Sequence, residues 1–129
     1  MKLLLDTHVM LWWLRDDPKL GPRSRADIAQ SDARLMVSIA SFWEFSIKFR
    51  KRKFEELGST LVAEATAQGL EVMEISPAHL RALESLPQIA GHNDPFDHLI
   101  LAQTIAENAT LVTSDHQLKS YNVKIWQNR

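Results

Sequence analysis

Short apolar runs alternate with helical patterns along the whole chain, and this alternation constrains the fold more than any other feature. Strands are expected at residues 2–6, 35–38, 71–75, 110–113 and 123–126. Helices are expected at residues 7–15, 39–53, 58–68, 77–86, 95–108 and 115–120, with a further one beginning at Gly21-Pro22. Strands separated by helices need crossover connections, which make neighbouring strands parallel. The sequence therefore predicts an α/β fold, with a mostly parallel central sheet and helices on both faces.

Composition limits the classes of protein to which the chain can belong. With 129 residues, 45% hydrophobic and 24% charged, we expect residues 1–129 to form a single globular domain. The net charge of −1 means that any contact with nucleic acid must come from a local basic patch. No cysteine is present, which excludes disulfides and thiolate metal sites.

The apolar start of the chain does not have the pattern of a signal peptide. Asp6 and His8 interrupt it after three leucines, and no small-residue cleavage site follows. No stretch reaches the roughly 18 apolar residues of a membrane helix. We expect a cytoplasmic protein with no membrane partner.

Four acidic residues lie where a predicted strand passes into a helix: Asp6, Glu44, Asp97 and Asp115. In an open α/β sheet the carboxyl ends of neighbouring strands share one crevice. Carboxylates gathered there repel one another unless a cation lies between them. Hard oxygen ligands without soft ones suit Mg²⁺ or Mn²⁺, and such sites act chiefly on phosphate esters.

Two of these acids have capping roles as alternatives. Asp6 is a good N-cap for the helix that follows it. Ser41 and Glu44 have the spacing of a capping box, which would explain Glu44 without a metal. If Ser38 is the cap instead, Glu44 lies almost two turns into the helix, among aromatic residues. The sequence leaves both alternatives open.

The other two acids also lie near helix starts. Asp94 is the natural cap of the helix that begins with Pro95, so its expected role is structural. Asp97 would complete only an unusual capping box, and facing the crevice is its better role. Asp115 directly follows Leu-Val-Thr-Ser, and its charge alone would favour a helix N-terminus.

Taken in order, these segments resemble the PIN-domain nucleases, and more closely the VapC-type toxins of bacterial and archaeal toxin–antitoxin pairs. The resemblance is carried by Leu3-Leu4-Leu5-Asp6-Thr7-His8 with Leu11-Trp12-Trp13-Leu14, Val37-Ser38 with Ser41-Phe42-Trp43-Glu44, His92-Asn93-Asp94-Pro95-Phe96-Asp97 with Leu101-Ala102-Gln103, and Leu111-Val112-Thr113-Ser114-Asp115. It implies a PIN-like three-layer sandwich and a Mg²⁺- or Mn²⁺-dependent endoribonuclease that inhibits translation. It also implies RNA as substrate, a cognate antitoxin as partner, and a homodimer.

The resemblance assigns roles to residues by position. The catalytic and metal-binding residues it implies are Asp6, Glu44, Asp97 and Asp115. Asp94 is expected at the rim of the site, and Thr113 is expected to support the site by hydrogen bonding. One departure is His98, where many relatives of this subgroup have arginine.

The densest basic run extends from Lys48 to Lys53. Lys48, Arg50, Lys51 and Arg52 are candidate RNA contacts, because an acidic cleft needs nearby positive charge to hold RNA. The alternative is a solvated helix end, where cations also favour the C-terminal dipole.

Aromatic residues and histidines give weaker signals. Phe42, Phe45 and Phe49 recur at helical spacing, which favours core packing over a partner groove. The histidines show no metal-ligand spacing. His8 and His92 are expected near the site, and His79 and His116 at the surface.

Two other functions compete with the nuclease. A non-catalytic module of the same fold would hold RNA or a partner in its cleft. A phospho-acceptor receiver or a dehalogenase-like phosphatase is disfavoured, because the phosphatase pattern needs Asp where His8 lies and Lys119 is poorly placed for a receiver.

Overall fold

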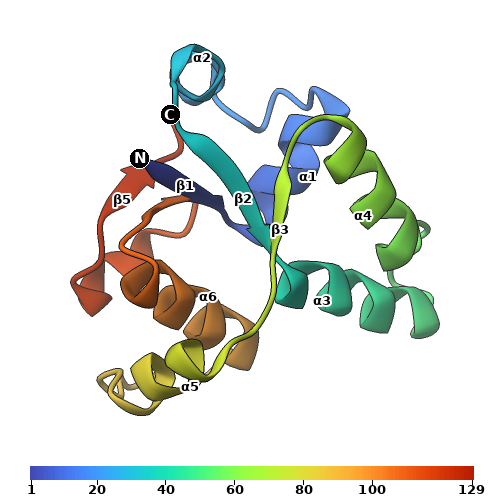
Figure 1. The fold of residues 1–129 in the computed structure, drawn as a ribbon. Coiled ribbons are helices and arrows are strands. Elements are labelled where there is room, and N and C mark those ends of the chain that lie inside the picture. The colour runs from blue at the N-terminus through green and yellow to red at the C-terminus, as the bar shows by residue number, and fades with distance from the viewer.

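The computed structural model describes residues 1–129, which form a five-stranded sheet covered by helices. The strands are β1 (Lys2–Leu5), β2 (Arg34–Ser38), β3 (Glu71–Met73), β4 (Thr110–Thr113) and β5 (Ile125–Gln127). Their order in the sheet is β3-β2-β1-β4-β5, and every neighbouring pair is parallel. The predicted parallel α/β fold is therefore confirmed (Figure 1).

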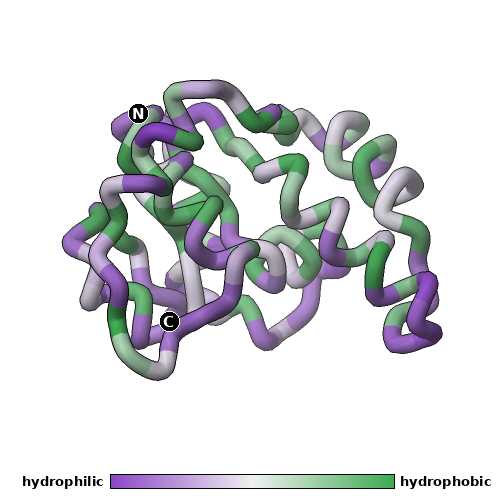
Figure 2. The backbone as a smooth tube through the Cα atoms, turned by 90° about the horizontal axis from the view of Figure 1, so that it is seen from below, coloured by the Kyte–Doolittle hydropathy of each residue, from purple (hydrophilic) through white to green (hydrophobic).

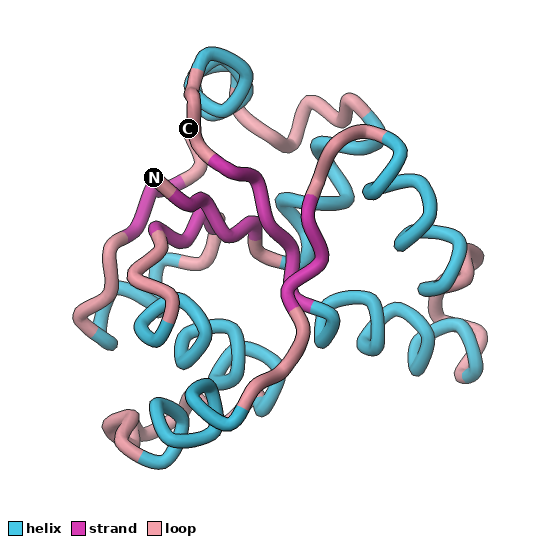
Figure 3. The backbone as a smooth tube through the Cα atoms, viewed as in Figure 1, coloured by secondary structure: helices cyan, strands magenta, loops and turns pink.

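Six α-helices and one short 3-10 helix connect and follow the strands. They are α1 (Thr7–Arg15), α2 (Pro22–Gln30), α3 (Ile39–Arg50), α4 (Gly58–Ala67), α5 (Pro77–Glu84), α6 (Pro95–Ala106) and η1 (His116–Tyr121). Figure 3 shows these helices on both sides of the sheet, with α3 and α4 projecting beyond the edge strand β3. The helix predicted to reach residue 53 ends at Arg50, and Arg52 then takes a left-handed φ of 57°.

Two hydrophobic layers hold the helices against the sheet. Leu3 and Leu5 of β1 pack with side chains from α1, α2, α3 and α4, whereas Leu4 packs on the opposite face with Ile100 and Leu101 of α6. This alternation follows from the two-residue period of a strand. It explains why β1 reads as a continuous apolar run: both of its faces are buried.

The central strands end at the same edge of the sheet. Leu5 is in register with Val37 of β2 and with Val112 of β4, and the backbone N–H of Asp6 donates to the Val112 carbonyl at 2.9 Å. The residues that follow these strands therefore face one another across this carboxyl edge.

The surface contains one strongly hydrophilic projection. In Figure 2 the segment just after α3 is coloured as hydrophilic, and it corresponds to the exposed run from Arg50 to Lys53. None of the helices combines the length and the hydropathy needed to cross a membrane.

Candidate functional site

Asp6 is fixed at the end of β1 by hydrogen bonds of its backbone and of both side-chain oxygens. Its backbone N–H donates to Val112, its Oδ1 accepts from the backbone N–H of Thr7 at 2.8 Å, and its Oδ2 accepts from Thr113 Oγ1 at 2.6 Å. Asp6 is thus the N-cap of α1. Burial raises the pKa of this carboxyl above its usual range, although the two side-chain hydrogen bonds act in the opposite direction.

Asp97 lies in the first turn of α6, whose N-cap is Asp94. The Asp94 side chain accepts from the backbone N–H of Phe96 at 2.9 Å, so it fulfils its predicted capping role. Asp97 takes no part in capping, and its side chain is 24% exposed and lies 3.5 Å from His92. Burial first, and then the neighbouring carboxylates Asp6, Asp94, Asp115 and Glu44, raise the pKa of Asp97 to about 7. The four acids predicted from the sequence therefore share one electrostatic neighbourhood.

The structure decides between the two alternatives for Glu44. Ser38 is the N-cap of α3 and accepts from the backbone N–H of Ala40 at 3.1 Å. Ser41 lies inside the helix, buried, with its hydroxyl 2.8 Å from Thr7 Oγ1. The capping-box interpretation is therefore wrong. Glu44 lies in the second turn, 16% exposed, and forms an ion pair with Lys48 at 3.1 Å.

Asp115 is tied to the same corner through Thr113. The backbone N–H of Asp115 donates to Thr113 Oγ1 at 3.0 Å, while that hydroxyl donates to Asp6. The Asp115 side chain caps η1 by accepting from the backbone N–H of Gln117 at 2.9 Å. One threonine hydroxyl thus connects two of the acidic residues.

His92 belongs to this cluster, which confirms its expected place near the site, although its spacing gave no sign of a metal ligand. Single ligand atoms from His92, Asp97 and Asp115 all lie within 4.8 Å of one another. His92 Nε2 is 3.5 Å from Asp97 Oδ2, and the residue is 8% exposed. The only signal in the sequence was its position five residues before Asp97, in a loop too irregular for a spacing rule.

Exposed aromatic and basic side chains border the acids. Trp43, next to Glu44, is 57% exposed and packs edge-to-face on Phe96, next to Asp97, with ring centroids 5.3 Å apart. Among the predicted RNA contacts, only Lys48 is paired with a site residue. The other three, Arg50, Lys51 and Arg52, are exposed, and at about 1.5 Å per residue Arg50 lies roughly 9 Å along α3 from Glu44.

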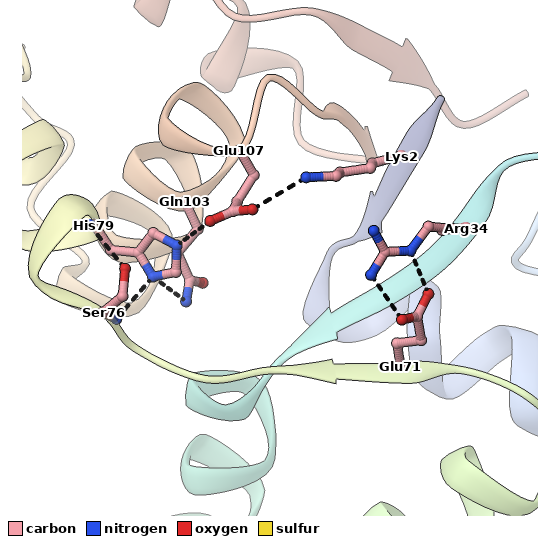
Figure 4. Close-up of polar contacts among 7 residues, drawn as sticks. All are labelled: Lys2, Arg34, Glu71, Ser76, His79, Gln103 and Glu107. Carbon is pink, nitrogen blue, oxygen red and sulfur yellow. Dashed lines mark hydrogen bonds and ion pairs between the residues drawn. The ribbon is translucent and has the colours of Figure 1, made fainter.

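The prediction that His79 lies at the surface is wrong. His79 is 2% exposed, and Figure 4 shows it between Ser76 and Glu107. Its Nδ1 accepts from the backbone N–H of Ser76 at 3.0 Å, and its Nε2 donates to Glu107 at 2.8 Å. Lys2 binds the same glutamate at 3.2 Å. This network joins the start of α5 to the end of α6 and to β1, and it includes none of the four acids predicted for the site.

The phenylalanines of α3 were expected either to pack in the core or to line a groove for a partner, and the structure shows both buried and exposed ones. Phe42 and Phe45 are buried in the core, as core packing predicts, whereas Phe49 is partly exposed at the far end of the helix. His8 and His116 are exposed, as expected for His116.

The donor set at the carboxyl edge fits a divalent cation. It offers carboxylate oxygens from Asp97 and Asp115 and a buried nitrogen of His92 that has no hydrogen-bond partner, and these atoms lie within 4.8 Å of one another. The crowding that raises the pKa of Asp97 is the electrostatic situation that a bound cation relieves.

The fold and the site together define a class of protein: an α/β domain with acidic residues gathered at the carboxyl edge of a parallel sheet. A family model described as PIN domain matches residues 3–124, and the chain belongs to this family. The resemblance seen in the sequence is thereby confirmed.

Individual relatives agree with this assignment. The chain is 27% identical to Ribonuclease VapC22 of Mycobacterium tuberculosis (strain ATCC 25618 / H37Rv) over 129 residues, covering 96% of this chain and 98% of that protein. It also matches VapBC2 from Rickettsia felis, solved bound to a DNA fragment from their promoter, with a TM-score of 0.77, 21% identity and full coverage of both chains. The DNA-bound VapBC of Salmonella typhimurium gives a TM-score of 0.68 at 18% identity, covering 98% of each chain. At these identities the two structures bear on the fold alone.

Proposed function

We propose that the protein is a metal-dependent endoribonuclease that hydrolyses RNA phosphodiester bonds, with Mg²⁺ or Mn²⁺ as its cofactor. Asp6, Glu44, Asp97 and Asp115 are its catalytic and metal-binding residues. The observation that carries the proposal is the gathering of possible ligand atoms of His92, Asp97 and Asp115 within 4.8 Å of one another, where burial and the surrounding carboxylates also raise the pKa of Asp97 to about 7. The ribonuclease named among the relatives supports RNA as the substrate.

The acids differ in how firmly they are held, and this suggests their roles. A bound divalent ion lowers the pKa of its water and neutralises charge on the phosphate. Asp6 and Asp115 each accept a backbone N–H as helix caps, so their orientations are fixed for binding a cation. Glu44 accepts no backbone N–H and pairs with the side chain of Lys48 instead. Asp97 accepts no backbone N–H either, but its carboxylate belongs with His92 and Asp115 to the group of possible metal ligands, so the role of taking a proton from the attacking water falls to Glu44.

The border of the site suits single-stranded RNA. The edge-to-face pair of Trp43 and Phe96 offers an exposed aromatic surface on which a base can stack. Lys48, and beyond it Arg50, Lys51 and Arg52, supply positive charge for backbone phosphates on one side of the acids. RNA would then lie along α3, with its phosphate over the carboxylates.

The partners follow from the same relatives. The matched structures are VapBC complexes, so we propose that this chain is the toxin of a toxin–antitoxin pair, neutralised by a cognate antitoxin. Phe49 and Leu57 are exposed on the α3–α4 projection and offer apolar surface for such a partner. We further propose that residues 1–129 act as a single cytoplasmic domain and form a homodimer.

The test is metal-dependent cleavage of RNA by purified protein. Asp6→Asn and Asp97→Asn should each abolish cleavage while circular dichroism shows an unchanged fold, because asparagine keeps the shape and loses the charge. Asp32→Asn is the matched control, since Asp32 is exposed just before β2 and therefore near the amino end of that strand, not the carboxyl edge. Cleavage at the wild-type rate by both site variants, with metal present, would rule out the assignment. Failure of calorimetry to detect Mn²⁺ at millimolar concentration would favour a non-catalytic binding module.

A further inference from the structure

His92 presents a buried nitrogen that no group of the protein satisfies. Its Nε2 is buried without a hydrogen-bond partner, and the nearest acid, Asp97 Oδ2, is 3.5 Å away. Buried polar atoms are nearly always paired, because an unpaired one costs about 1–3 kcal/mol. An unpaired nitrogen directed at a group of carboxylates therefore indicates that something outside the protein binds there.

The imidazole ring is held in place by its other nitrogen and by its backbone. His92 Nδ1 lies 2.8 Å from the hydroxyl of Tyr121, which is itself buried. The His92 carbonyl accepts from His98 Nε2 at 2.9 Å. When Nδ1–H donates to the Tyr121 oxygen, Nε2 keeps its lone pair free toward the acids. A hydrogen bond from the second ring nitrogen is what orients most metal-binding histidines in proteins.

The separation of the two side chains matches a pair of ligands better than a hydrogen bond. A good N–H···O contact is about 2.7–3.2 Å long, so 3.5 Å is too far for a strong one. Two ligand atoms each about 2.1 Å from one ion lie roughly 3.0 Å apart at a right angle and roughly 3.4 Å apart at the tetrahedral angle. The pair of His92 and Asp97 is close to that range without rearrangement.

We propose that His92 Nε2 is a direct ligand of the divalent ion, together with Asp97 and Asp115, and that this nitrogen makes the site prefer Mn²⁺ over Mg²⁺. Imidazole is a softer donor than carboxylate, and Mg²⁺ strongly favours oxygen. The inference rests on the proposed metal-dependent function in using the same carboxylates, but it concerns which ion they bind and through which atoms.

The decisive experiment is pulsed electron paramagnetic resonance on the whole protein with bound Mn²⁺. Coordinated imidazole gives a nitrogen hyperfine coupling, which we expect in the wild type and expect to be lost in His92→Gln. His8→Gln and His98→Gln are the controls: one removes an exposed histidine beside Asp6 and the other the neighbour that binds the His92 carbonyl. Both variants should keep the coupling.

Calorimetry adds a second readout. In His92→Gln the Kd for Mn²⁺ should rise about 10- to 100-fold, while the Kd for Mg²⁺ changes less than about threefold, because only the softer ion gains from nitrogen. If His92→Gln does not fold, Tyr121→Phe tests the same point, since it removes the partner of Nδ1 and should weaken Mn²⁺ more than Mg²⁺.

The outcomes separate this inference from the proposed function. A wild-type Mn²⁺ spectrum without nitrogen coupling overturns the inference even if the protein cleaves RNA, and His92 would then only hold Asp97 in place. Equal weakening of both ions in His92→Gln overturns the claimed preference. Nitrogen coupling in a protein that cleaves no RNA would uphold the ligand and defeat the nuclease.

Discussion

Replacing Asp97 by asparagine should stabilise the metal-free protein above neutral pH, even though it removes a residue of the proposed active site. The reason is the crowding of carboxylates, which together with burial raises the pKa of Asp97 from 3.8 to about 7. At about 1.4 kcal/mol per pH unit, the full change corresponds to roughly 4 kcal/mol. The side chain is 24% exposed and partly screened by water, so we expect about half of that, about 2 kcal/mol.

The sign follows from proton linkage. The folded protein binds the Asp97 proton more tightly than the unfolded chain does, so this proton stabilises the fold at low pH. The contribution is complete below about pH 4 and is lost as the pH rises to about 7. Asparagine resembles the protonated carboxyl, so the advantage of the variant should grow across this window and level off above it.

The assay is urea unfolding in the presence of a chelator, at about pH 4.5, 6 and 8. The gain in free energy of unfolding should be small at the lowest pH and reach about 2 kcal/mol at the highest, which corresponds to roughly 6–10 °C in Tm for a chain of this size. Asp32→Asn, at an exposed position, should change little at any pH. With saturating Mn²⁺ the wild type should become more stable than Asp97→Asn, because the ion stabilises only the protein that binds it. A pH-independent effect, or destabilisation at about pH 8, would refute the crowding argument.

Three further predictions concern other parts of the molecule. Trp43→Ala should raise KM for RNA about tenfold, with Trp43→Phe close to wild type, because one base stack is worth about 1–3 kcal/mol; a change in kcat alone would contradict this. Arg52→Gln should reduce the slope of log K for RNA binding against log salt concentration, measured by fluorescence anisotropy, by the amount expected for about one phosphate contact. An unchanged slope would show that Arg52 does not contact the RNA backbone. His79→Ala should cost about 2–4 kcal/mol of stability by chemical unfolding while folded protein cleaves RNA normally, because His79 joins Ser76 to Glu107 and binds none of the acids of the site. Loss of activity in folded His79→Ala protein would contradict that separation.

The helices and strands could be predicted from the sequence, because the signals that start and end them come from residues close together in the chain. The cap Asp94 marks the start of α6 through its own side chain. The buried runs of β1 and β4 identified the central strands. Each of these predictions needed only a few neighbouring positions, and each is confirmed.

The errors and omissions concern contacts between distant segments. Ser38 rather than Ser41 caps α3 because Ser41 is buried against Thr7, which lies 34 positions away. His79 is buried because Glu107 reaches it from the end of α6, 28 positions on. His92 joins the acidic cluster because Tyr121 holds its ring from η1. No local sequence pattern contains these distant partners. The burial of these side chains, and the contacts they make, could therefore not be predicted from the sequence.

Capping and metal binding, which competed as explanations of the acids, are compatible in this structure. Asp94 and Asp115 use Oδ1 for a backbone N–H at a helix start, which leaves Oδ2 available to the cleft. Asp6 also uses Oδ1 for a backbone N–H, but its Oδ2 already accepts from the hydroxyl of Thr113. The N-terminal ends of these helices favour negative charge, which offsets part of the repulsion among the carboxylates. Because asparagine is also a good cap, Asp→Asn variants should keep the helix starts and remove only the charge, whereas Asp→Ala variants remove both. Asparagine and alanine variants of Asp115, whose side chain makes only the capping hydrogen bond, should therefore lose cleavage alike and differ by about 1 kcal/mol in stability, and that difference measures the capping role separately from the metal site.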